Sequence, residues 1–146
     1  MADKKISQLT AKGSNLVASD RVPIAQDNGG GTFATKYVLG SQIHNWSLNK
    51  ESASYTLVLG DAHNYVEMEV SSANDLTVPA NASVAFPIGT EIRITQLGTG
   101  QTTILGDAGV TIRTQGGKNK TTGQYSVATL FKRGTNEWYL FGDLTT

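Results

Sequence analysis

Short segments in which apolar and polar residues alternate dominate the chain after Tyr55. A period of two is typical of β-strands with one buried face, and no segment after Lys50 shows a clear helical period of 3.6. Turns rich in Gly, Pro, Asn and Asp separate the segments at the spacing of a sandwich or barrel. We therefore expect an all-β fold, with an antiparallel β-sandwich or barrel-like domain over residues 55–146. The candidate strands are 55–59, 65–70, 76–78, 83–86, 91–97, 102–105, 110–113, 125–131 and 138–141.

The beginning of the chain carries a shorter pattern that is punctuated by glycine. Val22 and Ile24 flank Pro23, which has no N–H to donate and so indicates an edge strand or a strand start. The glycine-rich turn 27–31 follows, and then the alternating segment 32–39. This order predicts a β-hairpin.

An N-cap at Ser41 predicts a short helix that ends near Trp46. A hairpin and one helical turn are too small to bury a core of their own. We therefore interpret residues 1–46 as an attachment module and the polar residues 47–54 as a linker. The candidate attachment residues are apolar or aromatic: Ile6, Leu9, Val22, Ile24 and Tyr37.

The last candidate strand is apolar on both sides. Alternation sends Trp138 and Leu140 to one face, and Tyr139 and Phe141 to the other. One face of a strand in a lone sandwich is normally polar, so this strand is either central to a core or packed against another chain. Stacking of a sugar on Trp138 is the alternative.

The glycine-rich segment 116–120 predicts an exposed loop tip, where Lys118 and Lys120 can contact an acidic partner or a polysaccharide. These observations give one set of candidates for a subunit interface or a glycan contact: Trp138, Tyr139, Phe141, Lys118 and Lys120.

Composition excludes several function classes. The chain of 146 residues has a formal net charge of zero, which argues against a protein that neutralises many phosphates of a nucleic acid. It has no cysteine, so disulfides and thiolate metal sites are excluded. No apolar run reaches the ~20 residues of a membrane helix, and none follows Met1 as a secretory signal would require.

The sequence offers no convincing catalytic or metal-binding group. His44 and His63 are the only histidines, and neither has a second ligand at zinc spacing. Asp61 and Asn64 can in principle hold Ca²⁺, but an aspartate that stabilises a turn is far commoner. We expect no catalytic residue, no metal and no cofactor, and hence no enzyme.

A tetrapeptide occurs twice, as Leu59-Gly60-Asp61-Ala62 and as residues 105–108. Gly-Asp is common in turns, so two similar turns explain it better than an internal duplication does.

Two groups of motifs resemble virion proteins of tailed bacteriophages, especially tail-fibre and other appendage proteins. The segments Lys5–Leu9, Asp20–Ala25 and Thr35–Val38 resemble the N-terminal module of such proteins. The segments 74–79, 84–90, 109–113 and 137–144 resemble a β domain that recurs on phage structural proteins. The resemblance implies a homotrimer whose N-terminal module attaches to the particle and whose β domain points outward.

The leading hypothesis is thus a non-enzymatic virion component, a short trimeric fibre or spike assembled in the host cytoplasm and bound to other virion proteins. A capsid decoration, or cement, protein is the second hypothesis. A carbohydrate-binding adhesion module that recognises a host-surface glycan is the third. None of the three requires a nucleic acid or membrane insertion.

Overall fold

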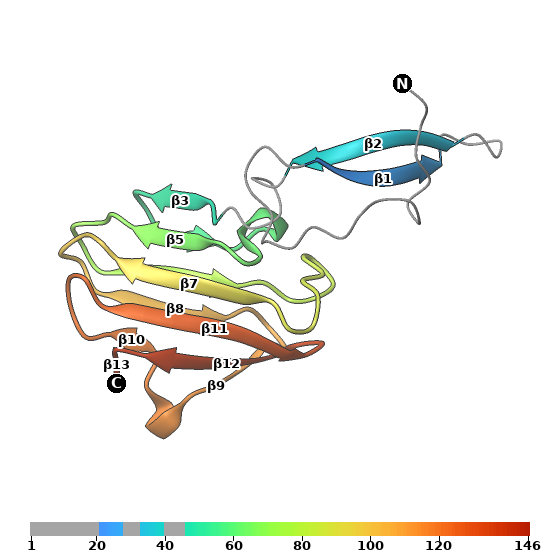
Figure 1. Cartoon of the computed structure of the whole chain (residues 1–146). Coiled ribbons are helices and arrows are strands. Elements are labelled where there is room, and N and C mark those ends of the chain that lie inside the picture. The colour runs from blue at the N-terminus through green and yellow to red at the C-terminus, as the bar shows by residue number, and fades with distance from the viewer. Residues whose placement is uncertain (1–20, 28–32, 40–45) are drawn as a thin grey trace. The chain divides into compact units, whose positions relative to one another are not determined.

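The computed structural model describes residues 21–27, 33–39 and 46–146 (Figure 1). The chain divides into two compact units, residues 1–45 and residues 46–146. The prediction of an all-β fold is confirmed: strands dominate the described residues, and they form separate sheets rather than a closed barrel.

The described part of the first unit is the predicted hairpin. Strand β1 (Arg21–Asp27) pairs antiparallel with β2 (Phe33–Leu39) along its full length. Pro23 lies in a two-stranded sheet, where each strand is an edge, so its missing N–H leaves no inner ladder broken.

The second unit consists of two sheets. The six-stranded sheet has the order β3-β5-β7-β11-β12-β9 (Figure 1). The five-stranded sheet has the order β13-β10-β8-β6-β4. The strands of the first are β3 (Leu48–Glu51), β5 (Tyr65–Met68), β7 (Glu91–Gln96), β11 (Val127–Gly134), β12 (Glu137–Gly142) and β9 (Thr111–Arg113). Those of the second are β13 (Leu144–Thr145), β10 (Lys120–Thr121), β8 (Thr102–Gly106), β6 (Asn74–Val78) and β4 (Tyr55–Thr56). Two 3₁₀ turns, η2 (Leu59–Asp61) and η3 (Gln115–Gly117), complete the elements.

The expectation of an antiparallel domain is wrong for its first half. From β3 to β8 the chain alternates between the two sheets, and each strand from β5 onward lies parallel to the second strand before it in the chain. Parallel strands need a long connection, and here that connection is a strand of the opposite sheet. The offset from Tyr65 to Arg93 equals that from Leu76 to Ile104, whereas the earlier offsets, from Leu48 to Tyr65 and from Tyr55 to Leu76, are shorter and differ from each other. This half is a short β-solenoid.

Two glycines allow the last windings to stack closely. A Cβ on Gly98 would lie 2.1 Å from the Val70 carbonyl oxygen, and one on Gly100 would lie 1.9 Å from that of Ser72. Only glycine fits at either position, which explains the glycine-rich segment 98–101 as a packing feature.

Antiparallel strands close the second half. β11 pairs with β7 on one side and with β12 on the other, while β10 pairs with β8 and β13. The exception is β9, which runs parallel to β12 at the edge of the six-stranded sheet.

Further expectations also differ from the structure. Residues 48–51 of the expected linker form β3, which pairs with β5 and belongs to the six-stranded sheet. The candidate strand 83–86 is instead part of a loop that follows Pro79, although Phe86 from this loop is buried.

One hydrophobic core lies between the sheets. Alternate residues of the central strands face it, as the burial patterns of β5, β6 and β7 show. Buried polar side chains also lie in the core: the Thr121 hydroxyl of β10 donates to the Gln96 side chain of β7 and so links the sheets, while within the five-stranded sheet the Thr102 hydroxyl donates to Asn74 Oδ1 at 2.9 Å. The largest fully buried side chains are Trp138, Lys132, Leu57, Met68, Leu76, Ile92, Ile94, Ile104, Leu130, Gln96, Val66 and Val78.

A lysine within this core fixes the loop that contains Phe86. Lys132, on the inner face of β11, is 1% exposed. Its ammonium donates to Asn81 Oδ1 at 2.6 Å and to the Phe86 carbonyl at 2.8 Å. Burial lowers the pKa of Lys132 because it disfavours the charged form. The ammonium therefore ties one strand to a loop that has no ladder of its own.

A buried carboxylate, that of Asp61, likewise ties neighbouring segments together near the start of the domain. Asp61 is 3% exposed, and its oxygens accept hydrogen bonds from Asn49 Nδ2 at 3.0 Å, Tyr55 OH at 3.0 Å and the Val58 N–H at 2.8 Å. Burial, followed by the bond to Asp61, raises the pKa of Tyr55 to about 12. Both carboxylate oxygens are thus occupied by protein donors.

Candidate functional site

A groove of about 440 Å³ opens where β9 leaves the edge of the six-stranded sheet. The pairing of β9 with β12 ends at Arg113, opposite Tyr139, and the chain then turns through η3. The groove lies between this turn and the second half of β12. Its lining residues are Arg113, Thr114, Gln115, Lys118, Tyr139, Leu140, Phe141, Gly142 and Leu144.

Two aromatic rings line the β12 side of the groove. Tyr139 is 41% exposed and Phe141 is 52% exposed, whereas Trp138 and Leu140, which alternate with them along the strand, are 1% and 2% exposed. The predicted alternation along this strand is therefore confirmed. One face of β12 packs into the core, and the aromatic rings on the other face remain accessible.

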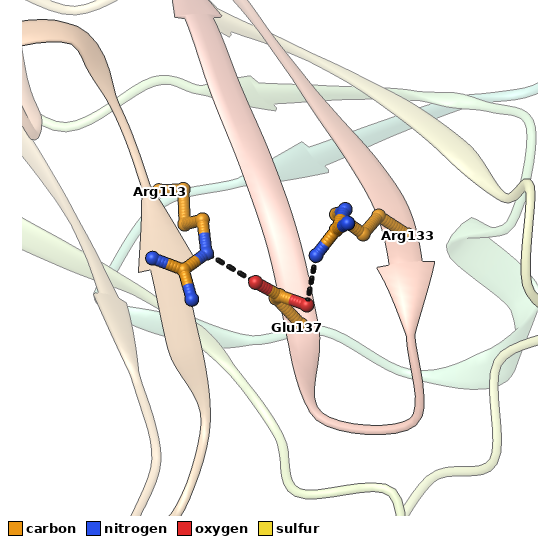
Figure 2. Close-up of polar contacts among 3 residues, drawn as sticks. All are labelled: Arg113, Arg133 and Glu137. Carbon is orange, nitrogen blue, oxygen red and sulfur yellow. Dashed lines mark hydrogen bonds and ion pairs between the residues drawn. The ribbon is translucent and has the colours of Figure 1, made fainter.

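Arg113, which lines the groove, belongs to an ion-pair triad with Glu137 and Arg133; Figure 2 shows the triad. Glu137 accepts a bond from Arg113 Nε and another from Arg133 Nη1, the latter at 2.5 Å. The bond from Arg113 is the main cause that lowers the pKa of Glu137, and it raises the pKa of Arg113. Two guanidinium groups share one carboxylate, so the triad keeps a net positive charge.

The turn after β9 supplies Lys118, the second cation that lines the groove after Arg113. Gly116 and Gly117 have φ angles of 67° and 73°, in the region that favours glycine. The Thr114 hydroxyl donates to the Lys118 carbonyl at 2.6 Å and closes the turn. This geometry places Lys118 in the lining of the groove, and within residues 46–146 it forms no ion pair.

The structure brings together three of the five candidate contact residues: Lys118, Tyr139 and Phe141. The prediction that Trp138 is a surface contact is wrong. Its ring packs edge-on against Phe86, with centroids 5.5 Å apart, and is inaccessible to a sugar or a second chain. Lys120 is half-buried in β10, opposite Thr103 and Thr145, and does not line the groove.

The attachment candidates are placed only in part. Val22 and Ile24 pair with Val38 and Lys36, whereas Tyr37 pairs with Pro23, so Tyr37 belongs to the alternate set of pairs. Ile6 and Leu9 lie outside the described residues, as does most of the predicted helix, residues 41–45.

Sequence reasoning missed the polar half of the groove. The sequence pattern marks Arg113 only as the end of a strand, and it indicates no contact role for Thr114 or Gln115. The parallel pairing of β9 with β12 brings them next to Tyr139, and no local pattern announces that pairing.

Among the residues that the structure describes, no group of three or more His, Asp or Glu side chains is arranged to hold a metal ion. The same part of the chain contains no helix with the length and apolar character that a membrane crossing requires.

Comparison with known proteins finds no match: no protein-family profile, curated protein or solved structure is significantly similar to the chain.

Proposed function

We propose that this chain is a non-enzymatic structural protein of a tailed-bacteriophage virion, a short trimeric fibre or spike. In this proposal the N-terminal unit attaches to other virion proteins and the β domain points away from the particle. The resemblance of residues 5–38 and 74–144 to phage appendage proteins motivates the proposal.

The observation that carries the proposal is the division into a hairpin unit and a separate β domain. A two-stranded hairpin is marginally stable in water, because two strands cannot cover both of their faces. A hairpin of this kind gains stability when it packs on another surface. Attachment to a neighbouring virion protein supplies such a surface.

The outer face of the six-stranded sheet supports the trimer. Large apolar side chains are exposed on or beside it, away from the groove: Trp46, Leu48 and Val127. The outer face of a lone sandwich is normally polar. Contact with further copies of the chain would bury these side chains.

Two measurements test the proposal. Light scattering on the purified full-length chain should give three times the mass of the 15.5 kDa monomer. A monomer at micromolar concentration contradicts the trimer. Imaging of phage particles that carry a labelled chain should then place it on a tail or neck appendage, and a regular distribution over the capsid would favour a decoration protein.

A further inference from the structure

We propose that the groove beside η3 binds a carboxylated saccharide, in which Tyr139 and Phe141 stack on the sugar while Lys118 and Arg113 bind the carboxylate. This proposal goes beyond the structural role above and does not depend on where the chain lies in a particle.

The aromatic rings provide the sugar-binding surface. The C–H face of a pyranose is apolar and flat, so it packs well against an aromatic ring that is exposed on the protein surface. Tyr139 and Phe141 are such rings, since each is more than two-fifths exposed while the strand that carries them is fixed by its buried residues. The Arg133 guanidinium lies over the Tyr139 ring, 5.6 Å from its centroid, so a sugar on Tyr139 would share that ring with a cation.

The charge of the groove selects an acidic ligand. Its lining contains Arg113 and Lys118 and no carboxylate. Residues 46–146 as a whole carry seven Lys or Arg against nine Asp or Glu, so a basic groove departs from the charge of its domain. Glu137 occupies Arg113 Nε, and the two terminal nitrogens of Arg113 point away from Glu137 (Figure 2). That end of the guanidinium matches the planar fork of a carboxylate.

Shape favours a saccharide over an extended peptide. The volume of about 440 Å³ lies within the range of about 300–1,000 Å³ that ligand pockets occupy. A peptide that adds to a sheet needs a long free strand edge. Beyond the end of β9, only Leu140–Gly142 of β12 is left as a free strand edge. The strand then ends at Gly142, which has a φ of 134°.

Binding can be measured by isothermal titration of the full-length chain with four probes. These are a hexagalacturonate, the neutral galactose hexasaccharide, a sulfated galactose hexasaccharide and hexaglutamate. We expect the hexagalacturonate to bind about tenfold or more tightly than the neutral sugar, as one charge-assisted hydrogen bond is worth about 1.5–3 kcal/mol. Its affinity should fall as salt is added.

Variants separate the two parts of the site. Lys118→Gln should weaken hexagalacturonate binding about tenfold, and Phe141→Leu, which keeps an apolar side chain without a flat ring, should weaken it several-fold. Lys120→Gln and Tyr125→Ala are matched controls, because Lys120 and the 68%-exposed Tyr125 lie outside the groove lining. Circular dichroism checks that each variant is folded.

Several results would overturn the proposal. One is the absence of hexagalacturonate binding at millimolar concentration, and another is equal binding of the neutral sugar. Equal or tighter binding of the sulfated sugar or of hexaglutamate would show that charge alone, or a peptide, is recognised. A loss in the control variants equal to that in Lys118→Gln would place the site elsewhere. A change of mass in Phe141→Leu would assign that ring to a subunit contact.

Discussion

Replacing Lys132 by methionine tests the account of the core most sharply. Methionine keeps an unbranched side chain of similar length beside Trp138 but removes the ammonium, whose bonds to Asn81 and Phe86 are then lost. A buried carbonyl without a donor costs about 1–3 kcal/mol, and the partly buried Asn81 side chain costs less because water can reach it. Relief of the desolvation of the ammonium offsets part of this cost. We expect a net loss of about 1–3 kcal/mol.

Lys132→Ala should cost more, about 3–5 kcal/mol, since it also leaves a cavity where the aliphatic stem lay. Urea unfolding of the full-length chain, followed by tryptophan fluorescence, measures both losses. Lys120→Met is the matched control and should change the free energy of unfolding by less than about 0.5 kcal/mol. If Lys132→Met is as stable as the original chain or more stable, the ammonium does not hold the loop and the reasoning is refuted.

The same variant has a signature in pH. The pKa of Lys132 is lowered in the folded protein from its usual 10.5, so the unfolded chain binds more protons between the two values. The free energy of unfolding therefore rises with pH as the pH approaches 10.5 from below. Lys132→Met should abolish that rise, which a pH series of urea titrations detects.

Two further predictions concern the core and the first winding. Trp138→Ala should cost about 3–5 kcal/mol in urea unfolding, while Tyr139→Ala on the same strand should cost about 1 kcal/mol or less; similar losses would contradict the burial of Trp138 against Phe86. Burial, followed by the bond to Asp61, raises the pKa of Tyr55 to about 12 from the ordinary 10.0, so stability should fall as the pH rises between these two values. Tyr55→Phe should remove this fall, and an unchanged alkaline profile would refute the assignment.

Local signals in the sequence predicted what local chemistry decides. The glycine-rich turn 27–31 between two alternating segments specified the β1–β2 hairpin. Alternation along β12 specified which of its residues share a face. It did not specify which face is buried, since both are apolar, and for this reason Trp138 was assigned to the surface.

Strand direction left no such signal. A period of two is the same in parallel and antiparallel strands, so residues 48–106 gave no indication of a solenoid. Expected linker residues became β3 because β5 offers them a parallel partner, which a local pattern cannot reveal. The repeated tetrapeptide does not mark the windings: Asp61 is buried in η2, whereas Asp107 is exposed and bonds to the Ala108 N–H.

Long-range pairing also created the groove. Arg113 and Tyr139 are neighbours only because β9 lies parallel to β12, and Lys118 joins them through a turn with two glycines at positive φ. The burial of Lys132 could not be predicted from the sequence for a related reason. A lysine near the end of a strand is typical of a solvated position, and its burial follows from the loop that folds over it.

Imaging of phage particles shows whether residues 1–45 attach the chain to a virion appendage. Particles that carry the full-length chain with a C-terminal label, compared with particles that carry a chain lacking residues 1–45, can be imaged by electron microscopy. We expect label on a tail or neck appendage in the first case and unlabelled particles in the second. Particles without label in both cases, or particles labelled equally in both, would contradict an N-terminal attachment module on a virion protein.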